Sequence, residues 1–292
     1  MECPHSALLR PSSATFEPLG AGEARLSLTW IAATETFGSG SKEAPSSALG
    51  ERGLIFEPRR SLCARAVPLH NRRDMCNLYS LTKGQSAIRD LFRVKHDRTG
   101  NLPLFPSIFP DQLAPIVRRG PDGERELVTA RWGMPGPPQF GGQPITNIRN
   151  VTSPHWRGWL GKNRRCIVPA TSFCEYADTK PRKTLTWFAL GEDRPLFAFA
   201  GLWTPWRGVR GPKSAPVAGD HELYGFLTTE ANAIVAPIHP KAMPVILTTP
   251  EEADHWLESD TPAALTLQRP LPDDALHIVA KGEKEDRVLP SL

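Results

Sequence analysis

The stretch RCIVPATSFCEYADTKPRKTLTWFALGEDRPLFAFAGLW, residues 165–203, decides the fold class. Short apolar runs rich in aromatic residues are separated in it by clusters of Gly, Pro, Asp and Lys, which is typical of β-strands joined by turns. Four strands are predicted: 166–168, 172–177, 184–190 and 196–203. The four residues Gly191–Arg194 lie between the last two runs and predict a hairpin.

The same pattern of short strands continues on both sides of this stretch. Thr82 and Gln85 form a capping-box signature ahead of an apolar helical face, which predicts a first helix. That face consists of Ala87, Ile88, Leu91 and Phe92. Further helices are predicted after Ser153, Thr229 and Thr249. Strands or extended segments are predicted at 113–117, 126–132, 223–228 and 244–247. Since strands and helices do not alternate as βαβ units would, the expected class is α+β, β-rich and antiparallel.

Composition supports this class and excludes others. The chain has 30 prolines and 23 glycines, which favour many turns over a helical bundle. Its five cysteines, at 3, 63, 76, 166 and 174, show no CxxC spacing, so neither structural zinc nor a disulfide framework is expected. No metal and no cofactor is predicted. No secretory signal or apolar run of about 20 residues is visible, so a soluble cytoplasmic protein is expected.

Net charge does not indicate a nucleic-acid-binding protein by itself. The chain carries +4, with nine Lys and Arg against eight Asp and Glu in residues 1–75, and 26 against 23 beyond. A basic groove for nucleic acid would therefore require Lys and Arg residues that the fold brings together on one part of the surface. Residues 1–74 lack sustained hydrophobic periodicity and are predicted to be mostly disordered. They are either a regulatory extension or upstream sequence added by a start codon assigned too early, and we favour the second.

The hexapeptide Met75–Ser80 resembles the start of a protein, although it lies a quarter of the way along the chain. If Cys76 were N-terminal, it would carry an α-amine and a thiol on adjacent carbons. With a pKa near about 7.7 to 8, that amine is partly unprotonated at neutral pH and can condense with an aldehyde. The thiol can then close onto the imine to give a thiazolidine. The alternative is that Cys76 is a small buried hydrophobic residue.

Two further stretches offer groups for proton transfer. In Ser172–Ala177, period-2 alternation places Glu175 on the same face as Phe173. A carboxyl group on an apolar face tends to have a raised pKa and can serve as a general acid, although a solvated strand glutamate fits equally well. In Ile238–Pro244, two prolines stiffen a loop that carries His239 and Lys241. A single loop histidine is more often structural than catalytic.

Two other stretches offer groups for DNA. Asn147 and Arg149 supply an amide and a guanidinium suited to sugar or phosphate oxygens, or else they belong to an ordinary turn. Arg131 and Trp132 place a cation beside an aromatic ring at a strand end. Stacking platforms for unpaired bases have this composition, as do many core tryptophans.

Taken in order, these stretches resemble the SOS-response-associated peptidase (SRAP) family of abasic-site processing proteins. The resemblance runs from 76 to about 285 and divides the chain into 1–74, a catalytic domain at 75–285 and a tail at 286–292. It rests on six motifs: Met75-Cys-Asn-Leu-Tyr79, Arg131-Trp-Gly-Met-Pro135, Asn147-Ile-Arg-Asn150, Arg165-Cys-Ile-Val-Pro-Ala170 leading to Phe173-Cys-Glu-Tyr176, Leu227-Thr-Thr-Glu-Ala-Asn232 and His239-Pro-Lys-Ala-Met-Pro-Val-Ile-Leu247.

The resemblance implies a monomeric domain with a barrel-like antiparallel core and flanking short helices. It would bind single-stranded DNA at an abasic site and crosslink to the opened sugar through Cys76, with possible self-cleavage before that residue. Glu175 would help open the sugar ring, His239 would transfer protons and Asn147 would orient the sugar or the cysteine. The DNA-binding residues implied are Asn77, Arg131, Trp132, Arg149, Thr228 and Lys241. Binding to DNA would place the protein on the nucleoid.

The chain departs from the family pattern at three places. Asn77-Leu78 stand where many members have Gly-Arg, which removes one basic DNA contact. Val151 stands where many have a glutamate, and the segment from His239 to Met243 is one residue longer than the family's His-x-Arg-Met-Pro.

Two other functions fit the same residues. A thiol peptidase acting on peptides would use Cys76, His239 and Glu175 without needing a free α-amine. A module that binds single strands without covalent chemistry would lose affinity in salt and would tolerate Cys76→Ala.

Overall fold

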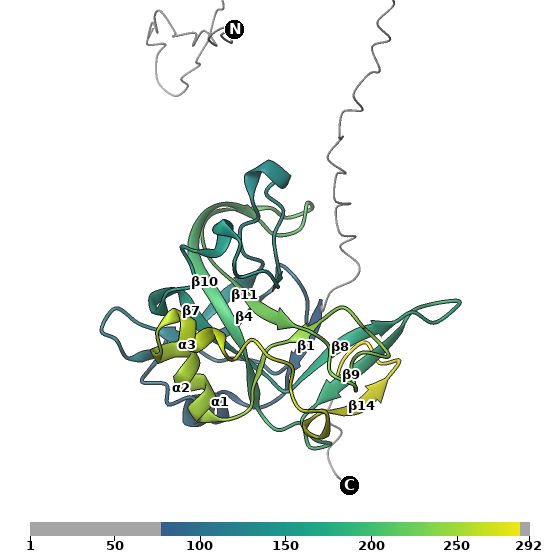
Figure 1. Ribbon diagram of the computed structural model, residues 1–292. Coiled ribbons are helices and arrows are strands. Elements are labelled where there is room, and N and C mark those ends of the chain that lie inside the picture. Colours follow the sequence, from purple (N-terminus) through teal and green to yellow (C-terminus); the bar gives the residue numbers. More distant parts are fainter. Residues whose placement is uncertain (1–76, 287–292) are drawn as a thin grey trace, which may run out of the picture. The chain divides into compact units, whose positions relative to one another are not determined.

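A five-stranded barrel forms the centre of the computed structural model, which describes residues 77–286 (Figure 1). Its strands pair in the order β11-β10-β7-β4-β5, and β11 closes the ring by pairing with β5 through Leu223 and Tyr224. Their bounds are β4 (Leu113–Arg119), β5 (Arg125–Trp132), β7 (Arg165–Ala170), β10 (Phe197–Arg210) and β11 (Val217–Thr229). The barrel-like, β-rich fold expected from the sequence is therefore confirmed. The closing pair β11–β5 is parallel, in an otherwise antiparallel ring.

A second, antiparallel sheet carries the beginning and the end of the described chain. Its order is β14-β9-β8-β1-β3. The bounds are β1 (Leu78–Leu81), β3 (Phe105–Ile108), β8 (Ser172–Ala177), β9 (Thr184–Ala189) and β14 (His277–Lys281). Chain order alone does not place β1 next to β8, yet they pair directly, which brings the residues after Cys76 to the strand that holds Glu175.

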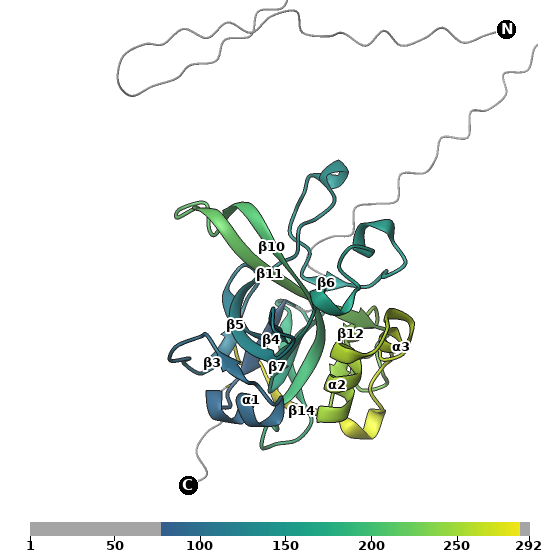
Figure 2. The ribbon, with the colours of Figure 1, turned by 90° about the vertical axis from the view of Figure 1, so that its left-hand side faces the viewer.

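The remaining elements are short. The strands are β2 (His96–Asp97), β6 (Asn147–Ile148), β12 (Met243–Pro244) and β13 (Ile246–Leu247), and the helices are α1 (Gln85–Leu91), α2 (Pro250–Glu258) and α3 (Thr261–Leu265). Single 3-10 turns occupy Pro138–Phe140, Pro154–Trp156, Lys162–Arg164 and Asp273–Ala275. Figure 2 shows α2 and α3 packed side by side on one flank of the barrel, with α1 below it. Within residues 77–286, no helix has both the length and the apolar character needed to cross a membrane.

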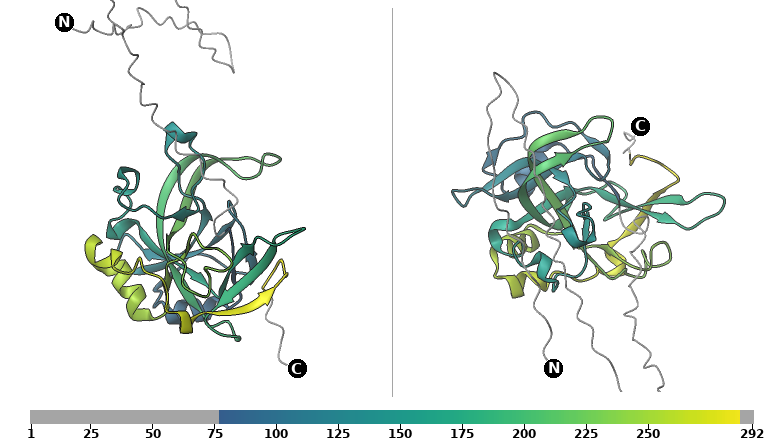
Figure 3. Two further views of the ribbon diagram at one scale, coloured as in Figure 1. Left: turned by 45° about the vertical axis from the view of Figure 1, so that its right-hand side comes forward. Right: turned by 90° about the horizontal axis from the view of Figure 1, so that it is seen from above.

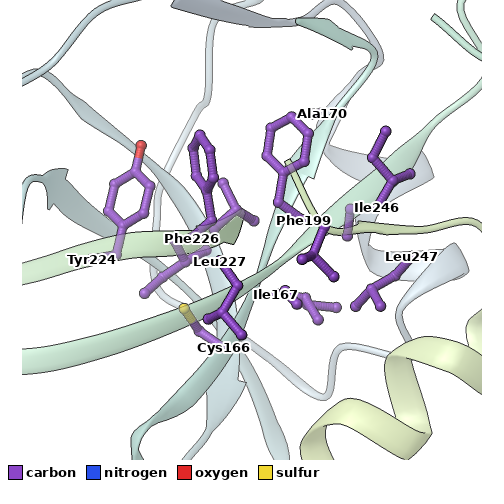
Figure 4. Packing of buried hydrophobic residues seen from close by; sticks show 14 of the residues in the cluster. Cys166, Ile167, Ala170, Phe199, Tyr224, Phe226, Leu227, Ile246 and Leu247 are labelled. Atoms are coloured by element: carbon purple, nitrogen blue, oxygen red, sulfur yellow. The ribbon is translucent and has the colours of Figure 1, made fainter. Parts of the chain in front are cut away.

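Aromatic rings fill the core between the barrel and the second sheet. The Tyr79 ring meets Trp132, Phe199 and Phe226 edge-on, at centroid distances of 5.2, 5.6 and 6.1 Å. Its hydroxyl lies 2.6 Å from that of Tyr224, so two buried phenols satisfy each other. Figure 4 shows Phe199, Phe226 and Tyr224 in this core, with Ile167 and Leu247 nearby. Such edge-to-face pairs add about 0.5–1.5 kcal/mol each beyond burial, which fixes β1 firmly against the barrel.

Local signals were reliable at α2 and misleading at α1. Thr249 caps α2 as predicted, because its side chain accepts a hydrogen bond from the backbone N–H of Glu252. The predicted capping box of α1 is wrong: the cap residue is Gly84, and the Thr82 hydroxyl contacts Thr171 on the neighbouring strand instead. Gln85 is turned outward to the 97–100 loop, where it donates to Gly100. Contacts with Thr171 and with the 97–100 loop thus take the place of the capping hydrogen bonds that the sequence predicted for Thr82 and Gln85.

Two other sequence predictions are corrected by the sheet pairing. The expected hairpin of 184–190 with 196–203 does not form, since β9 pairs with β8 and β14 while β10 pairs with β7, β11 and β13. The loop at 191–194 instead passes the chain from one sheet to the other. No helix begins at Thr229, which ends β11. The short helix predicted after Ser153 is present as a 3-10 helix, with Ser153 at the cap position and Pro154 as its first residue.

Asp286, which the sequence assigned to the tail, is buried and holds the end of the described chain in place. Its carboxylate lies 3.0 Å from the Arg194 guanidinium and accepts a 2.6 Å hydrogen bond from Ser172. Its backbone N–H donates to Pro106. The carboxylate is 1% exposed and the Arg194 side chain 9% exposed, so water screens this ion pair little.

Asp286→Ala is expected to destabilise the protein by about 3–5 kcal/mol, because it leaves the Arg194 charge buried without its partner. The measurement is the free energy of unfolding from urea titration. The matched control is Asp220→Ala, which breaks a pair with Arg207 whose side chains are 82% and 83% exposed. Exposed pairs contribute about 0–1 kcal/mol. Equal effects of the two substitutions would contradict the structural role of Asp286.

Candidate functional site

The described chain begins beside the strand that carries Glu175. Asn77 directly precedes β1, and the register places Leu78 opposite Cys174 and Tyr79 opposite Phe173. Because β1 and β8 are antiparallel, the chain comes closer to Glu175 as it is followed back from Tyr79 through Leu78 to Asn77. Cys76 itself lies outside the described residues, and its role stays a prediction.

Glu175 and His239 are brought together although 64 positions separate them in the sequence. Glu175 Oε2 lies 3.7 Å from His239 Nδ1, and the two side chains are 2% and 10% exposed. This separation exceeds a hydrogen bond, so the contact is electrostatic and becomes an ion pair when the imidazole is protonated. The sequence prediction that Glu175 shares the buried face of Phe173 is confirmed.

Backbone contacts fix the imidazole of His239. Its Nδ1 donates to the carbonyl oxygen of Ala242 at 2.8 Å, which places the proton on Nδ1 in the neutral ring and leaves the lone pair on Nε2. The backbone N–H of His239 donates to Val235, whose own N–H is held by the side chain of Asn232. Asn232 in turn donates to Leu271. The loop that carries His239 is therefore anchored at several points, as its two prolines predicted.

A second polar group forms around β6. This strand pairs in parallel with β11, with Asn147 opposite Phe226. The Asn147 amide donates to the Thr146 hydroxyl at 2.9 Å, and that hydroxyl lies 3.4 Å from Oδ1 of Asn77. Thr146 thus links the predicted residues Asn147 and Asn77. Sequence reasoning did not select Thr146, since its role comes from the pairing of β6 with β11.

Thr228, the second-last residue of β11, lies near these groups. It lies two residues beyond Phe226, the partner of Asn147, and pairs with Pro244 in the segment that follows His239. The residue is 2% exposed, and within residues 77–286 its hydroxyl has no hydrogen-bond partner. A buried hydroxyl without a partner costs free energy, so a bound ligand that supplied one would be favoured.

Two predicted cations lie exposed next to this buried set. Arg149 follows Asn147 by two residues, its side chain is 44% exposed, and its guanidinium lies 3.9 Å from Glu230. Lys241 is exposed in the loop between His239 and β12. Exposed cations bordering buried polar groups are suited to hold the backbone of an anionic polymer.

Trp132 does not belong to this surface, which corrects one predicted DNA contact, and the neighbouring Arg131 is bound to a partner within the protein. Trp132 is fully buried, stacks on Phe226 at 5.2 Å and donates its indole N–H to Thr146. Arg131 donates to the carbonyl oxygen of Asp111, and its side chain is 14% exposed. Closure of the barrel between β5 and β11 covers both residues, so Trp132 cannot stack on a base in this conformation.

The two described cysteines do not supply a nucleophile. Cys166 and Cys174 are both buried. Burial, reinforced by the charge of Glu175, raises the pKa of the Cys174 thiol to about 12, and burial raises the pKa of Cys166 further. Since the thiolate is the reactive form, both are inert at neutral pH. Among residues 77–286, no three His, Cys, Asp or Glu side chains gather as a metal site requires.

This chain is similar to several curated relatives and solved structures. The abasic site processing protein YoqW of Bacillus subtilis (strain 168) is 33% identical over 160 residues, which cover 52% of this chain and 65% of YoqW. YoaM from the same organism is 29% identical, covering 63% and 79%. The abasic site processing protein HMCES of Pongo abelii is 28% identical, covering 59% and 57%. The chain thus spans just under two thirds of YoqW.

Solved structures show the same fold. A protein from Bordetella bronchiseptica is 25% identical with a TM-score of 0.55, covering 71% of this chain and 98% of that protein. A protein from Bacteroides thetaiotaomicron is 20% identical with a TM-score of 0.53, covering 69% and 90%. The model of the SOS response associated peptidase family matches residues 75–282. Because that match takes in most of the chain and every residue of the site, this protein belongs to the SOS response associated peptidase (SRAP) family.

Proposed function

We propose that this protein processes abasic sites in single-stranded DNA by forming a covalent thiazolidine crosslink through Cys76. The observation that carries the proposal is the buried Glu175–His239 pair, 3.7 Å apart, next to the strand that begins two residues after Cys76. The names of YoqW, YoaM and HMCES support the same lesion as substrate. The protein would act as a monomer in the cytoplasm, on the nucleoid when it is bound to DNA.

Glu175 would act first, on the closed sugar of the abasic site. That sugar is a cyclic hemiacetal, and an amine reacts only with its open aldehyde form. Ring opening breaks the C1′–O4′ bond, places a proton on O4′ and removes one from the C1′ hydroxyl. A protonated Glu175 on its apolar face would donate the first proton, and the Nε2 lone pair of His239 would take the second.

Cys76 would then capture the aldehyde. Its amine adds to C1′ to give a carbinolamine, which loses water to form an imine. The thiol adds to the imine carbon and its proton passes to the nitrogen, which closes a five-membered ring without any oxidant or reductant. Reversal runs the same steps backwards, so His239 would take part in both directions.

Asn147 and the exposed cations would hold the substrate. The Asn147 amide, tied to Thr146, would orient the sugar or the cysteine, and the Thr228 hydroxyl would gain a partner from the DNA. Arg149 and Lys241 would contact phosphates next to the lesion, and Asn77 would contact the same strand. Arg131 and Trp132 are left out of this proposal because both are committed to the protein interior.

The test is a denaturing gel with a chain that begins at Cys76, as verified by intact mass. We expect a band that survives denaturation with single-stranded DNA containing an abasic site, and no such band with undamaged DNA of the same sequence. Mass analysis of the adduct should show loss of one water relative to the two reactants. Absence of the band across a range of salt concentrations would remove the proposal.

A further inference from the structure

The hairpin between β8 and β9 ends in a basic tip, defined here as residues 178–183. Its three cations, Lys180, Arg182 and Lys183, are all exposed, and Asp178 is its one acidic residue. Figures 1 and 3 show the hairpin projecting away from the body of the barrel, so the tip is set apart from the rest of the surface. A concentrated positive charge in such a position is available to a large partner.

Hydrogen bonds close the basic tip into a defined turn. The last strand pair is Ala177 with Thr184. The Thr179 hydroxyl donates to the carbonyl oxygen of Arg182 at 2.7 Å and lies 2.7 Å from the Thr184 hydroxyl. Within the described residues, none of the three cations lies within 4 Å of a carboxylate. The three positive charges are therefore not neutralised by a carboxylate of the described chain, and they are available to an external anion.

The basic tip is continuous with the site of the proposed function. Glu175 lies on β8, five residues before Lys180. At about 3.3–3.4 Å per residue along an extended chain, the tip lies at most roughly 17 Å from Glu175. In duplex DNA each strand has one phosphate every 3.4 Å or so along the axis, so this distance spans at most about five nucleotides of a duplex and fewer of an extended single strand.

We propose that the basic tip binds backbone phosphates on one side of the abasic site, within about five nucleotides of the lesion. This rests on the proposed function, since it takes the sugar to lie at Glu175. The phosphates belong to the damaged strand itself or to a duplex that begins next to the lesion. Both present the same chemistry, and the oligonucleotides of the test distinguish them.

The experiment measures binding of the full-length protein to fluorescent DNA by anisotropy. The probe carries a tetrahydrofuran abasic analogue, which has no aldehyde and so reports affinity without crosslinking. The variant is Lys180→Gln/Arg182→Gln/Lys183→Gln. The matched control removes three cations on or beside α1, as Lys83→Gln/Arg89→Gln/Lys95→Gln. With ten nucleotides on each side of the analogue, we expect the tip variant to bind roughly tenfold more weakly at 50 mM salt, and the control to match wild type.

Salt dependence tests the electrostatic origin of the loss. Each neutralised phosphate contributes about 0.7 to the slope of log affinity against log salt on a single strand, and about 0.9 on a duplex. The slope of the tip variant should therefore fall by about 2 on a single strand, or by nearly 3 if the tip contacts a duplex arm. Comparing single-stranded probes with probes that have one duplex arm identifies which form supplies the phosphates.

Arm length tests the position. Cutting one arm to a single nucleotide should abolish the difference between wild type and tip variant, while cutting the other arm should preserve it. Equal affinities of wild type and variant at every length and salt would overturn the inference and leave the tip for another partner, such as an acidic protein. A difference that persists with both arms cut would overturn it too, because it would reflect net charge alone.

The two proposals fail separately. If wild-type protein crosslinks natural abasic sites and the tip variant binds normally, only the inference about the basic tip falls. If the tip variant binds weakly while no crosslink forms with a verified Cys76 N-terminus, the proposed function falls and the phosphate contact remains.

Discussion

Full-length protein that keeps the peptide bond between residues 75 and 76 is expected to form no thiazolidine adduct, although it still binds DNA. In the intact chain the nitrogen of Cys76 is a peptide amide, whose lone pair is delocalised into the carbonyl group of Met75. It cannot condense with an aldehyde. The expected loss of crosslinking is therefore complete, whatever the geometry of Glu175 and His239.

Two routes can free the amine. Translation can begin at Met75, after which an aminopeptidase removes the methionine, or the Cys76 thiol can attack the carbonyl of Met75 and cut the leader. In the second route the C–N bond breaks, the acyl group moves to sulfur, and water then hydrolyses the thioester. This self-cleavage would account for the peptidase activity named in the family description.

Met75→Pro provides the test protein, because proline at this position discourages aminopeptidase trimming and self-cleavage. Intact mass must confirm that the leader is still attached. The comparison is a chain with a verified N-terminal Cys76, and the second control is that same chain with its α-amine acetylated and its thiol free. We expect a crosslinked band only from the unmodified N-terminal cysteine. Equal crosslinking rates for the intact and trimmed proteins would exclude the aminothiol chemistry.

The acetylated control also separates the proposed function from peptide hydrolysis. A thiol peptidase needs the sulfur of its cysteine and not the α-amine. Acetylation would then spare cleavage of a peptide substrate and abolish only the DNA adduct. Non-covalent binding of single strands, the remaining alternative, would survive both acetylation and Cys76→Ala.

Local rules predicted the orientation of Glu175 and failed for Trp132, for a physical reason. The alternation of side chains along β8 is a property of any strand, so the shared face of Phe173 and Glu175 could be inferred from spacing alone. Whether Trp132 faces water depends on the partner of β5. That partner is β11, about 90 residues later, and closure of the barrel buries the indole against Phe226.

The same distinction applies to the rest of the site. The prolines around His239 predicted a fixed loop, but the 3.7 Å approach to Glu175 requires the whole barrel between them. Thr146 and Asp286 could not be predicted because their contacts are with residues distant in the sequence. Thr146 contacts Asn77, and Asp286 contacts Arg194. The predicted hairpin at 191–194 failed because β9 and β10 pair in different sheets, and Arg194 in the connection is bound to the distant Asp286.

Glu175→Gln is expected to slow adduct formation by about 10²- to 10⁴-fold, the usual contribution of a general acid or base. The amide keeps the shape of the carboxyl group but cannot protonate O4′, so the loss should fall on ring opening. The measurement is the single-turnover rate of adduct formation by the chain that begins at Cys76.

The matched control for Glu175→Gln is Glu126→Gln. Glu126 is a second buried carboxylate, 3% exposed, and it is paired with Arg98, directly after β2, and with Arg118 on β4. Both substitutions replace a buried carboxyl group by an amide, so both can reduce stability, and urea midpoints will report that effect. Only Glu175→Gln should change the rate of crosslinking in protein that is shown to be folded.

A second substrate locates the affected step. An oligonucleotide that carries an acyclic aldehyde in place of the sugar needs no ring opening. Glu175→Gln should react with it at nearly the wild-type rate, whereas His239→Ala should remain slow on both substrates, because imine formation and its reversal still need a proton carrier next to C1′. If Glu175→Gln is equally slow on the acyclic aldehyde, the carboxyl group acts later than ring opening. An unchanged rate on the natural abasic site would remove Glu175 from the chemistry and leave it as the electrostatic partner of His239.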